Sequence, residues 1–157
     1  MEEIINILTK RNKTISFMES CTGGALANFI TNIEGASKVL KFSAVTYSNE
    51  YKIKMGVSKD IIDKYSVYSI EVAMEMSKCI SNFSNSDYAV GVTGKLNKID
   101  ENNLYGKDNV VFISIYDKNL DKFYNYNIEV NKEDRKENKK LVIDFIEKEL
   151  LKIIKEK

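Results

Sequence analysis

Two candidate nucleophiles stand side by side in the segment ESCTGG, residues 19–24, where Ser20 is followed directly by Cys21. The segment comes after an apolar, strand-like run over residues 14–18, and a helix-like pattern begins at Ala25. The two glycines at its end allow a ligand to approach the backbone closely. Free amide groups at the start of a helix attract anions such as phosphate. The pattern therefore predicts the floor of a pocket that contains a nucleophile.

The chain contains no histidine, which excludes a serine–histidine–aspartate triad and histidine-ligated metals. A hydrolytic site would need another base, and lysine is the plausible one. A free lysine has a reference pKa of about 10.4 and is protonated at neutral pH. Burial beside apolar groups or other cations can lower that pKa to roughly 7–8, where the amine can accept a proton.

Each candidate nucleophile also has a structural interpretation. Ser20 or Thr22 can cap the following helix, which is the commonest task for such residues. A thiol at Cys21, near a helix N-terminus, would have a lowered pKa and real reactivity. A small cysteine buried behind the site is nevertheless the favoured interpretation of Cys21. Cys79 lies on the apolar face of a predicted helix and is interpreted as a core residue.

Hydrophobic periodicity predicts helices and strands in alternation along the chain. Their order favours an α/β fold, a three-layer α/β/α single domain with a mixed β-sheet whose last two strands form a hairpin. Ser58 and Ser69 are expected to cap two of the helices. Residues 95–108 are polar and irregular, which predicts a long loop. Helices are expected over 2–11, from 25 onward, and over 51–55, 59–64, 70–83 and 132–155, and strands over 14–18, 39–47, 87–92, 110–116 and 123–130.

The composition is that of an ordinary globular chain. Its 157 residues are expected to form one domain, residues 1–157. The formal net charge of +1 shows no basic bias, so charge does not suggest binding to nucleic acid. The apolar runs are too short to cross a membrane, and residues 1–11 have the pattern of an amphipathic helix, not of a signal peptide. A cytoplasmic location follows as the default, and it disfavours a disulfide between the two cysteines.

Three segments at predicted strand ends resemble the CinA C-terminal domain family. They are residues 19–24, residues 47–52 (YSNEYK) and residues 92–94 (VTG), and the helix start at 67–69 with Glu71 matches as well. Their order and spacing agree along most of the chain. Family members of known activity are nicotinamide mononucleotide deamidases. The resemblance therefore implies hydrolysis of the amide of that nucleotide.

The resemblance implies Ser20 as the nucleophile, Lys52 as its base, and Tyr47 as the residue that orients Lys52 or relays protons to it. Arg135, near the start of the last helix, is implied as a phosphate contact, and a surface ion pair is an equal alternative. The implied partners are a small-molecule nucleotide and a second copy of the chain in a homodimer, without a metal or a cofactor. The residues expected to bind the substrate are Cys21, Thr22, Gly23, Gly24, Ser48, Asn49, Thr93, Gly94 and Arg135.

Residues 95–108 depart from the family pattern, because the family has a glycine- and proline-rich loop where this chain continues with KLNKID. This departure motivates an alternative function, a non-catalytic member that binds a nucleotide-like ligand or a protein partner. A third interpretation is an enzyme that depends on Cys21. The amides at the start of the helix over 23–33 are expected to hold either an oxyanion or the nucleotide phosphate, and the sequence leaves both open.

Overall fold

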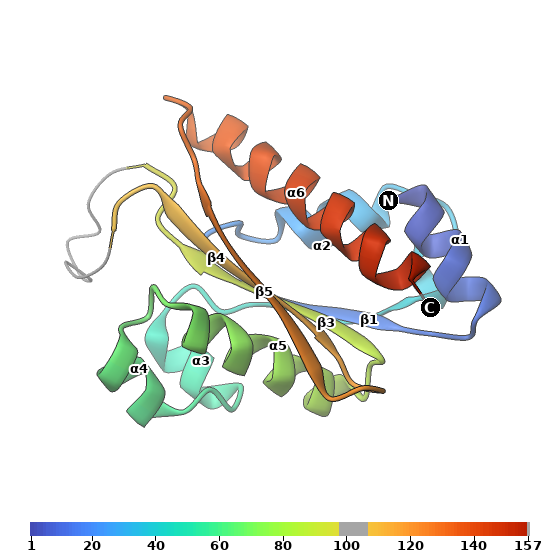
Figure 1. Ribbon diagram of the computed structural model, residues 1–157, viewed down its shortest axis with the longest axis horizontal. Coiled ribbons are helices and arrows are strands. Elements are labelled where there is room, and N and C mark those ends of the chain that lie inside the picture. Colours follow the sequence, from blue (N-terminus) through green and yellow to red (C-terminus); the bar gives the residue numbers. More distant parts are fainter. Residues whose placement is uncertain (98–106, 157) are drawn as a thin grey trace.

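A computed structural model describes residues 1–97 and 107–156 and shows the expected α/β architecture (Figure 1). The strands are β1 (Ile15–Glu19), β2 (Leu40–Val45), β3 (Tyr88–Gly94), β4 (Val110–Asp117) and β5 (Lys122–Glu129). The helices are α1 (Glu2–Lys10), α2 (Ala25–Thr31), α3 (Asn49–Lys54), α4 (Lys59–Tyr65), α5 (Ile70–Ser84) and α6 (Arg135–Lys155), with a short 3₁₀ turn, η1 (Ala36–Lys38).

The five strands form one mixed sheet in the order β2-β1-β3-β4-β5. Strand β1 is parallel to both of its neighbours, β2 and β3, because helical segments connect these strands and return the chain to the same edge. Strands β3, β4 and β5 are antiparallel in succession. The predicted mixed sheet and its C-terminal hairpin are therefore confirmed.

Helices cover both faces of the sheet, with α1, α2 and α6 on one side and α3, α4 and α5 on the other (Figure 1). Successive residues of a strand point to opposite faces. Accordingly, Phe17 packs into the core cluster shared with α1, α2 and α6, and Met18 packs into the cluster shared with α4 and α5. The central strands are buried on both faces, which is why their sequences are almost continuously apolar.

Two helix starts expected from the sequence are confirmed by their caps. Ser58 and Ser69 each accept a hydrogen bond from the amide three residues later, at the starts of α4 and α5. The last helix begins at Arg135 and not near residue 132, because the Asp134 carboxylate caps it there.

The chain just after β3 differs from the polar loop expected over 95–108. Lys95 and Leu96 are buried, and Leu96 belongs to the core cluster that includes the inner face of α6. The apolar side chain of Leu96 anchors this segment, which explains the difference. Residues 98–106 of the expected loop lie outside the described residues.

Candidate active site

The candidate site lies at the carboxyl ends of the parallel strands β1 and β2. Just beyond β1, the Ser20 amide donates a hydrogen bond to the Val92 carbonyl of β3 at 3.0 Å. The Thr46 amide, just beyond β2, donates to the Glu19 carbonyl at 2.8 Å. The backbone at Ser20 is thus held by both neighbours of β1, at the edge where open α/β sheets bind their ligands.

The side chain of Lys52 contacts Ser20 at this edge of the sheet. Its Nζ donates hydrogen bonds to Ser20 Oγ at 3.0 Å and to the Thr46 carbonyl oxygen at 2.7 Å. The lysine is only 1% exposed, which is rare for this residue type. Burial is the main cause that lowers the pKa of Lys52 to about 8, against a smaller opposing effect of Cys21. Roughly a tenth of the lysine is therefore neutral at pH 7 and able to accept the serine proton.

Helix α3 carries Lys52 into the site. The Ser48 hydroxyl caps this helix by accepting a hydrogen bond from the Tyr51 amide at 3.3 Å. Tyr51 and Lys54 of the same helix are exposed, whereas Lys52 faces inward. Ser48 thus has a structural role that sequence analysis did not assign, and its expected contact with substrate stays a prediction.

Tyr47 lies outside the buried pair. Its side chain is 66% exposed, and its hydroxyl accepts a hydrogen bond from Arg135 Nη2 at 3.5 Å. In the described part of the chain, the Tyr47 hydroxyl has no bond to Lys52, so its role as orienter of that lysine stays a prediction. The structure instead brings Tyr47 together with Arg135, 88 positions away along the chain.

The Glu19 carboxylate is a site feature that sequence analysis missed. Glu19 is fully buried and accepts hydrogen bonds from the amides of Gly24, Leu26 and Ala27 at 3.1, 3.0 and 2.9 Å. A carboxylate at a helix N-terminus satisfies unpaired amides and complements the positive end of the helix dipole. These amides were expected to hold an oxyanion or a phosphate, and that expectation is wrong for the three that Glu19 occupies.

We expect Glu19→Gln to lower the free energy of unfolding by about 2–4 kcal/mol, measured by urea titration. The substitution removes the charge and turns one acceptor oxygen into an amide donor that faces the helix amides. The matched control is Glu129→Gln on β5, whose carboxylate is exposed and pairs with Lys107 at 3.3 Å, and which should change stability by less than about 1 kcal/mol. Equal losses in the two variants would contradict the assigned role of Glu19.

The turn between β1 and α2 is tight. The Gly23 amide donates to the Ser20 carbonyl at 3.0 Å, and Gly23 and Gly24 have φ angles of +61° and +90°, a region that glycine adopts readily. Gly24 is the N-cap residue of α2 and has no side chain to cap it, so the first amides of the helix donate to Glu19 instead. The alternative in which Ser20 or Thr22 caps this helix is therefore wrong. The Thr22 hydroxyl is buried without a hydrogen-bond partner among the described residues.

Cys21 is buried behind the turn. Burial is the main cause that raises the pKa of its thiol to about 12, although nearby Lys52 and Arg135 favour the thiolate. The raised pKa favours the protonated thiol, contrary to the lowered pKa that a reactive Cys21 would need. The interpretation of Cys21 as a packed core residue holds. Cys21 and Cys79 are both free, and Cys79 is partly buried against the core on the α5 side.

The remaining predicted binding residues lie on two neighbouring elements. Thr93 is buried on β3, and its hydroxyl donates to the Val67 carbonyl at 2.9 Å. Gly94 ends β3 where a Cβ would come within 2.5 Å of the Val110 carbonyl oxygen. Asn49 is the first residue of α3 and is half-buried. Their contacts with a substrate stay predictions.

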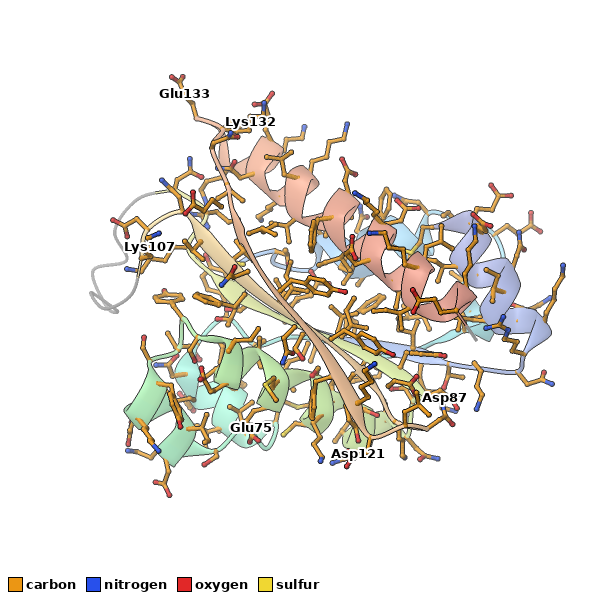
Figure 2. All side chains as sticks on the ribbon, viewed as in Figure 1. Glu75, Asp87, Lys107, Asp121, Lys132 and Glu133 are labelled. Carbon is orange, nitrogen blue, oxygen red and sulfur yellow. The ribbon has the colours of Figure 1, made fainter. Side chains whose placement is uncertain are left out.

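A buried asparagine fixes the start of α6 next to the site. The Asn138 side chain donates to the Leu96 carbonyl at 2.6 Å and accepts from the Lys132 amide at 2.9 Å. The Asn97 side chain in turn donates to the Glu133 carbonyl at 2.8 Å. Figure 2 shows Lys132 and Glu133 beyond the end of β5, where the chain turns into α6. These hydrogen bonds join the segment that follows β3 to the start of α6, the helix that contains Arg135.

The described residues, 1–97 and 107–156, contain no group of three or more histidine, cysteine, aspartate or glutamate side chains placed to hold a metal ion. In the same ranges, no helix is both long enough and apolar enough to cross a bilayer. The groups that the site presents are the hydroxyl of Ser20, the amine of Lys52 and the guanidinium of Arg135.

A mixed sheet between two helical layers, with a buried serine–lysine pair beyond strand β1, defines the class of protein: a three-layer α/β/α protein with a candidate nucleophile and base at its strand ends. Residues 1–153 match the family described as CinA C-terminal domain. The chain belongs to this family, and the resemblance seen in the sequence is confirmed.

Relatives by sequence carry the same family name or a related one. A Clostridium botulinum (strain Langeland) protein named as competence-damage inducible is 47% identical over 96 residues, which cover 60% of this chain and 24% of that protein. A CinA-like protein of Endomicrobium trichonymphae is 35% identical over 147 residues, 92% of this chain and 34% of that protein. The chain thus spans about a quarter to a third of the length of these relatives.

Solved structures share the fold. A CinA superfamily protein of Klebsiella pneumoniae superposes with a TM-score of 0.90 at 19% identity, covering 99% of this chain and 96% of that one. One from Escherichia coli gives a TM-score of 0.87 at 23% identity, with coverages of 97% and 89%. At these identities the likeness shows the fold, and the chemistry has to be argued from the site.

Proposed function

We propose that this chain hydrolyses the amide of nicotinamide mononucleotide to nicotinate mononucleotide and ammonia. The observation that carries the proposal is the 3.0 Å hydrogen bond between Lys52 Nζ and Ser20 Oγ, in a buried setting that lowers the pKa of the lysine to about 8. The family resemblance supplies the substrate, and the serine–lysine pair supplies a histidine-free way to cleave its amide bond.

The reaction begins when neutral Lys52 takes the proton of the Ser20 hydroxyl and the oxygen attacks the amide carbon. The resulting tetrahedral intermediate expels ammonia, which receives its extra proton from the Lys52 ammonium. A nicotinoyl ester on Ser20 remains. Water, deprotonated by the again neutral Lys52, attacks this ester and releases the carboxylate product, and the proton returns to Ser20.

The Thr22 amide is the proposed donor to the oxyanion. The amides of Gly23, Gly24 and Leu26 already have acceptors within the turn or in Glu19. The described residues offer no acceptor to the Thr22 amide, which lies two positions after the nucleophile. A preorganised amide at this place would stabilise the negative charge that develops on the substrate oxygen.

The experiment that tests the proposal measures ammonia and nicotinate mononucleotide formed by the purified protein from nicotinamide mononucleotide. Stoichiometric formation of both products is expected. Stabilisation of the protein by the nucleotide in a thermal-shift assay without turnover would contradict the proposal and favour a non-catalytic nucleotide-binding protein. A homodimer and a cytoplasmic location go with this proposal, and light scattering on the purified protein tests the first.

We expect this activity to survive removal of the Cys21 thiol. Cys21→Ala should retain kcat within a few-fold, since the thiol is buried and its pKa is raised to about 12. Activity should likewise persist in wild-type protein treated with a thiol-alkylating reagent under native conditions. Loss of all turnover in Cys21→Ala, with an unchanged circular dichroism spectrum, would assign the nucleophile to the cysteine instead.

A further inference from the structure

A cationic side chain lies directly over the turn that carries the nucleophile. A Cβ on Gly23 would lie 3.3 Å from Lys139 Nζ, and no other atom beyond the adjoining residues comes within 4 Å of that point in the described chain. Gly23 is exposed and Lys139 is half-buried. The absence of a side chain at Gly23 is therefore what lets the ammonium group lie against the turn, where a ligand that reaches the turn from solvent would meet it.

The Lys139 ammonium lies near Ser20 as well. The 3.0 Å hydrogen bond from the Gly23 amide to the Ser20 carbonyl closes a tight turn, in which the Cα atoms of these two residues are less than about 7 Å apart. A substrate whose amide carbon meets Ser20 can thus present a group at its other end to Lys139.

A second cation accompanies Lys139 on the same face of α6. Arg135 precedes it by four positions, one helical turn, and residues so spaced lie on one face. The ion pairs among the described residues involve neither Arg135 nor Lys139. Lys139 is half-buried, whereas Arg135 and the neighbouring charged side chains Asp134, Lys136, Glu137 and Lys140 are exposed. Two cations without acidic partners thus face the mouth of the site.

The alternative anion site in this region is occupied by the protein itself. The Glu19 carboxylate accepts hydrogen bonds from the amides of Gly24, Leu26 and Ala27. An anionic group of a substrate therefore has to be bound by side chains from outside the turn. Asn138, anchored to Leu96 and Lys132, holds in place the part of α6 that offers them.

We infer that Lys139 binds the phosphate group of the substrate and makes the site selective for a mononucleotide over the corresponding nucleoside. The inference rests on the proposed function and names the residue of that site that recognises the phosphate. An ammonium in contact with a phosphate forms charge-assisted hydrogen bonds, which are roughly twice as strong as neutral ones. A nucleoside offers this ammonium only a neutral hydroxyl in place of the phosphate.

The first test compares nicotinamide mononucleotide with nicotinamide riboside as substrates. Lys139→Met should lower kcat/KM for the nucleotide by about tenfold or more, mainly through KM, and leave kcat/KM for the riboside within about twofold. Lys139→Arg should retain the preference because it keeps the charge. The matched control is Lys140→Met, the exposed neighbour on the same helix, which should behave like wild type. Equal effects of Lys139→Met on both substrates would overturn the inference.

The second test separates this inference from the proposed function. Calorimetry with Ser20→Ala protein measures binding of nicotinamide mononucleotide without turnover, and competition by inorganic phosphate. We expect Lys139→Met in that background to weaken nucleotide binding by about tenfold or more and to abolish the competition. A wild-type protein that binds the nucleotide through Lys139 but never releases ammonia would refute the proposed function alone. Nucleotide binding that is absent, or indifferent to Lys139, would overturn the inference.

Discussion

Ser20→Ala should lower kcat for ammonia release from nicotinamide mononucleotide by roughly 10⁴-fold or more. The substitution removes the oxygen that attacks the substrate, and no other hydroxyl is bonded to Lys52 Nζ in the described chain. Substrate binding should persist, because Ser20 is not among the groups inferred to hold the phosphate. Steady-state kinetics and calorimetry measure the two effects separately.

The matched control for this variant is Ser58→Ala, which removes the hydroxyl that caps α4. Its expected effect is a loss of about 1 kcal/mol in stability with kcat unchanged. Ser20→Ala should show the opposite pattern, with a native circular dichroism spectrum and almost no turnover. Retention of more than about a hundredth of wild-type kcat would rule out Ser20 as the nucleophile.

The second large effect concerns Lys52 and the pH dependence of the reaction. The base works only when neutral, so the wild-type rate should rise with pH and level off above the lysine pKa of about 8. Lys52→Met should lower kcat by roughly 10²–10⁴-fold and remove this rise. Lys54→Met is the matched control, because Lys54 is exposed on the same helix and pairs with Glu50 at 2.5 Å. A rate that reaches its maximum or its plateau several pH units below 8 would contradict the assignment of Lys52 as the base.

The lowered pKa of Lys52 also predicts how the stability of the protein depends on pH. Burial lowers the pKa of Lys52 from its ordinary value of 10.5 to about 8 in the folded protein. Between these pH values the unfolded chain binds more protons, so the free energy of unfolding rises with pH. Below pH 8 the full penalty of burying the amine is present. The stability advantage of Lys52→Met over wild type should therefore be greatest below pH 8 and shrink toward pH 10.5. A pH-independent difference in urea titrations would show that Lys52 is not the titrating group.

Local sequence was sufficient for the layers of the fold, and the family resemblance supplied the serine–lysine pair. Strand patterns such as that over 14–18 and the caps Ser58 and Ser69 depend on neighbouring residues alone, and they were confirmed. The pairing of residues 20 and 52 was expected from the family resemblance, and Lys52 Nζ and Ser20 Oγ lie 3.0 Å apart in the structure. The burial that lowers the pKa of Lys52 could not be read from its sequence neighbours, most of which are polar.

Several site contacts join positions far apart in the chain and left no local signal. Glu19 stands five to eight positions before the amides that it binds, farther than a helix-capping residue reaches in sequence patterns. Asn138 sits in a charged run typical of a solvated helix face, yet it is fully buried. Nothing in the sequence places Lys139 within reach of Gly23.

The sequence by itself determined which chemistry is available and where along the chain it lies. With no histidine, hydrolytic chemistry has to use serine, threonine, cysteine, lysine, tyrosine, aspartate or glutamate, and the family resemblance singles out Ser20 and Lys52 among them. Only the tertiary structure decided which groups are already used and which stay open to a ligand. In the folded chain the amides of Gly24, Leu26 and Ala27 donate to Glu19. Tyr47 contacts Arg135, and Lys139 lies against Gly23. The physical reason is that burial and hydrogen-bond partners arise from the packing of α3 and α6 against strand ends distant in sequence.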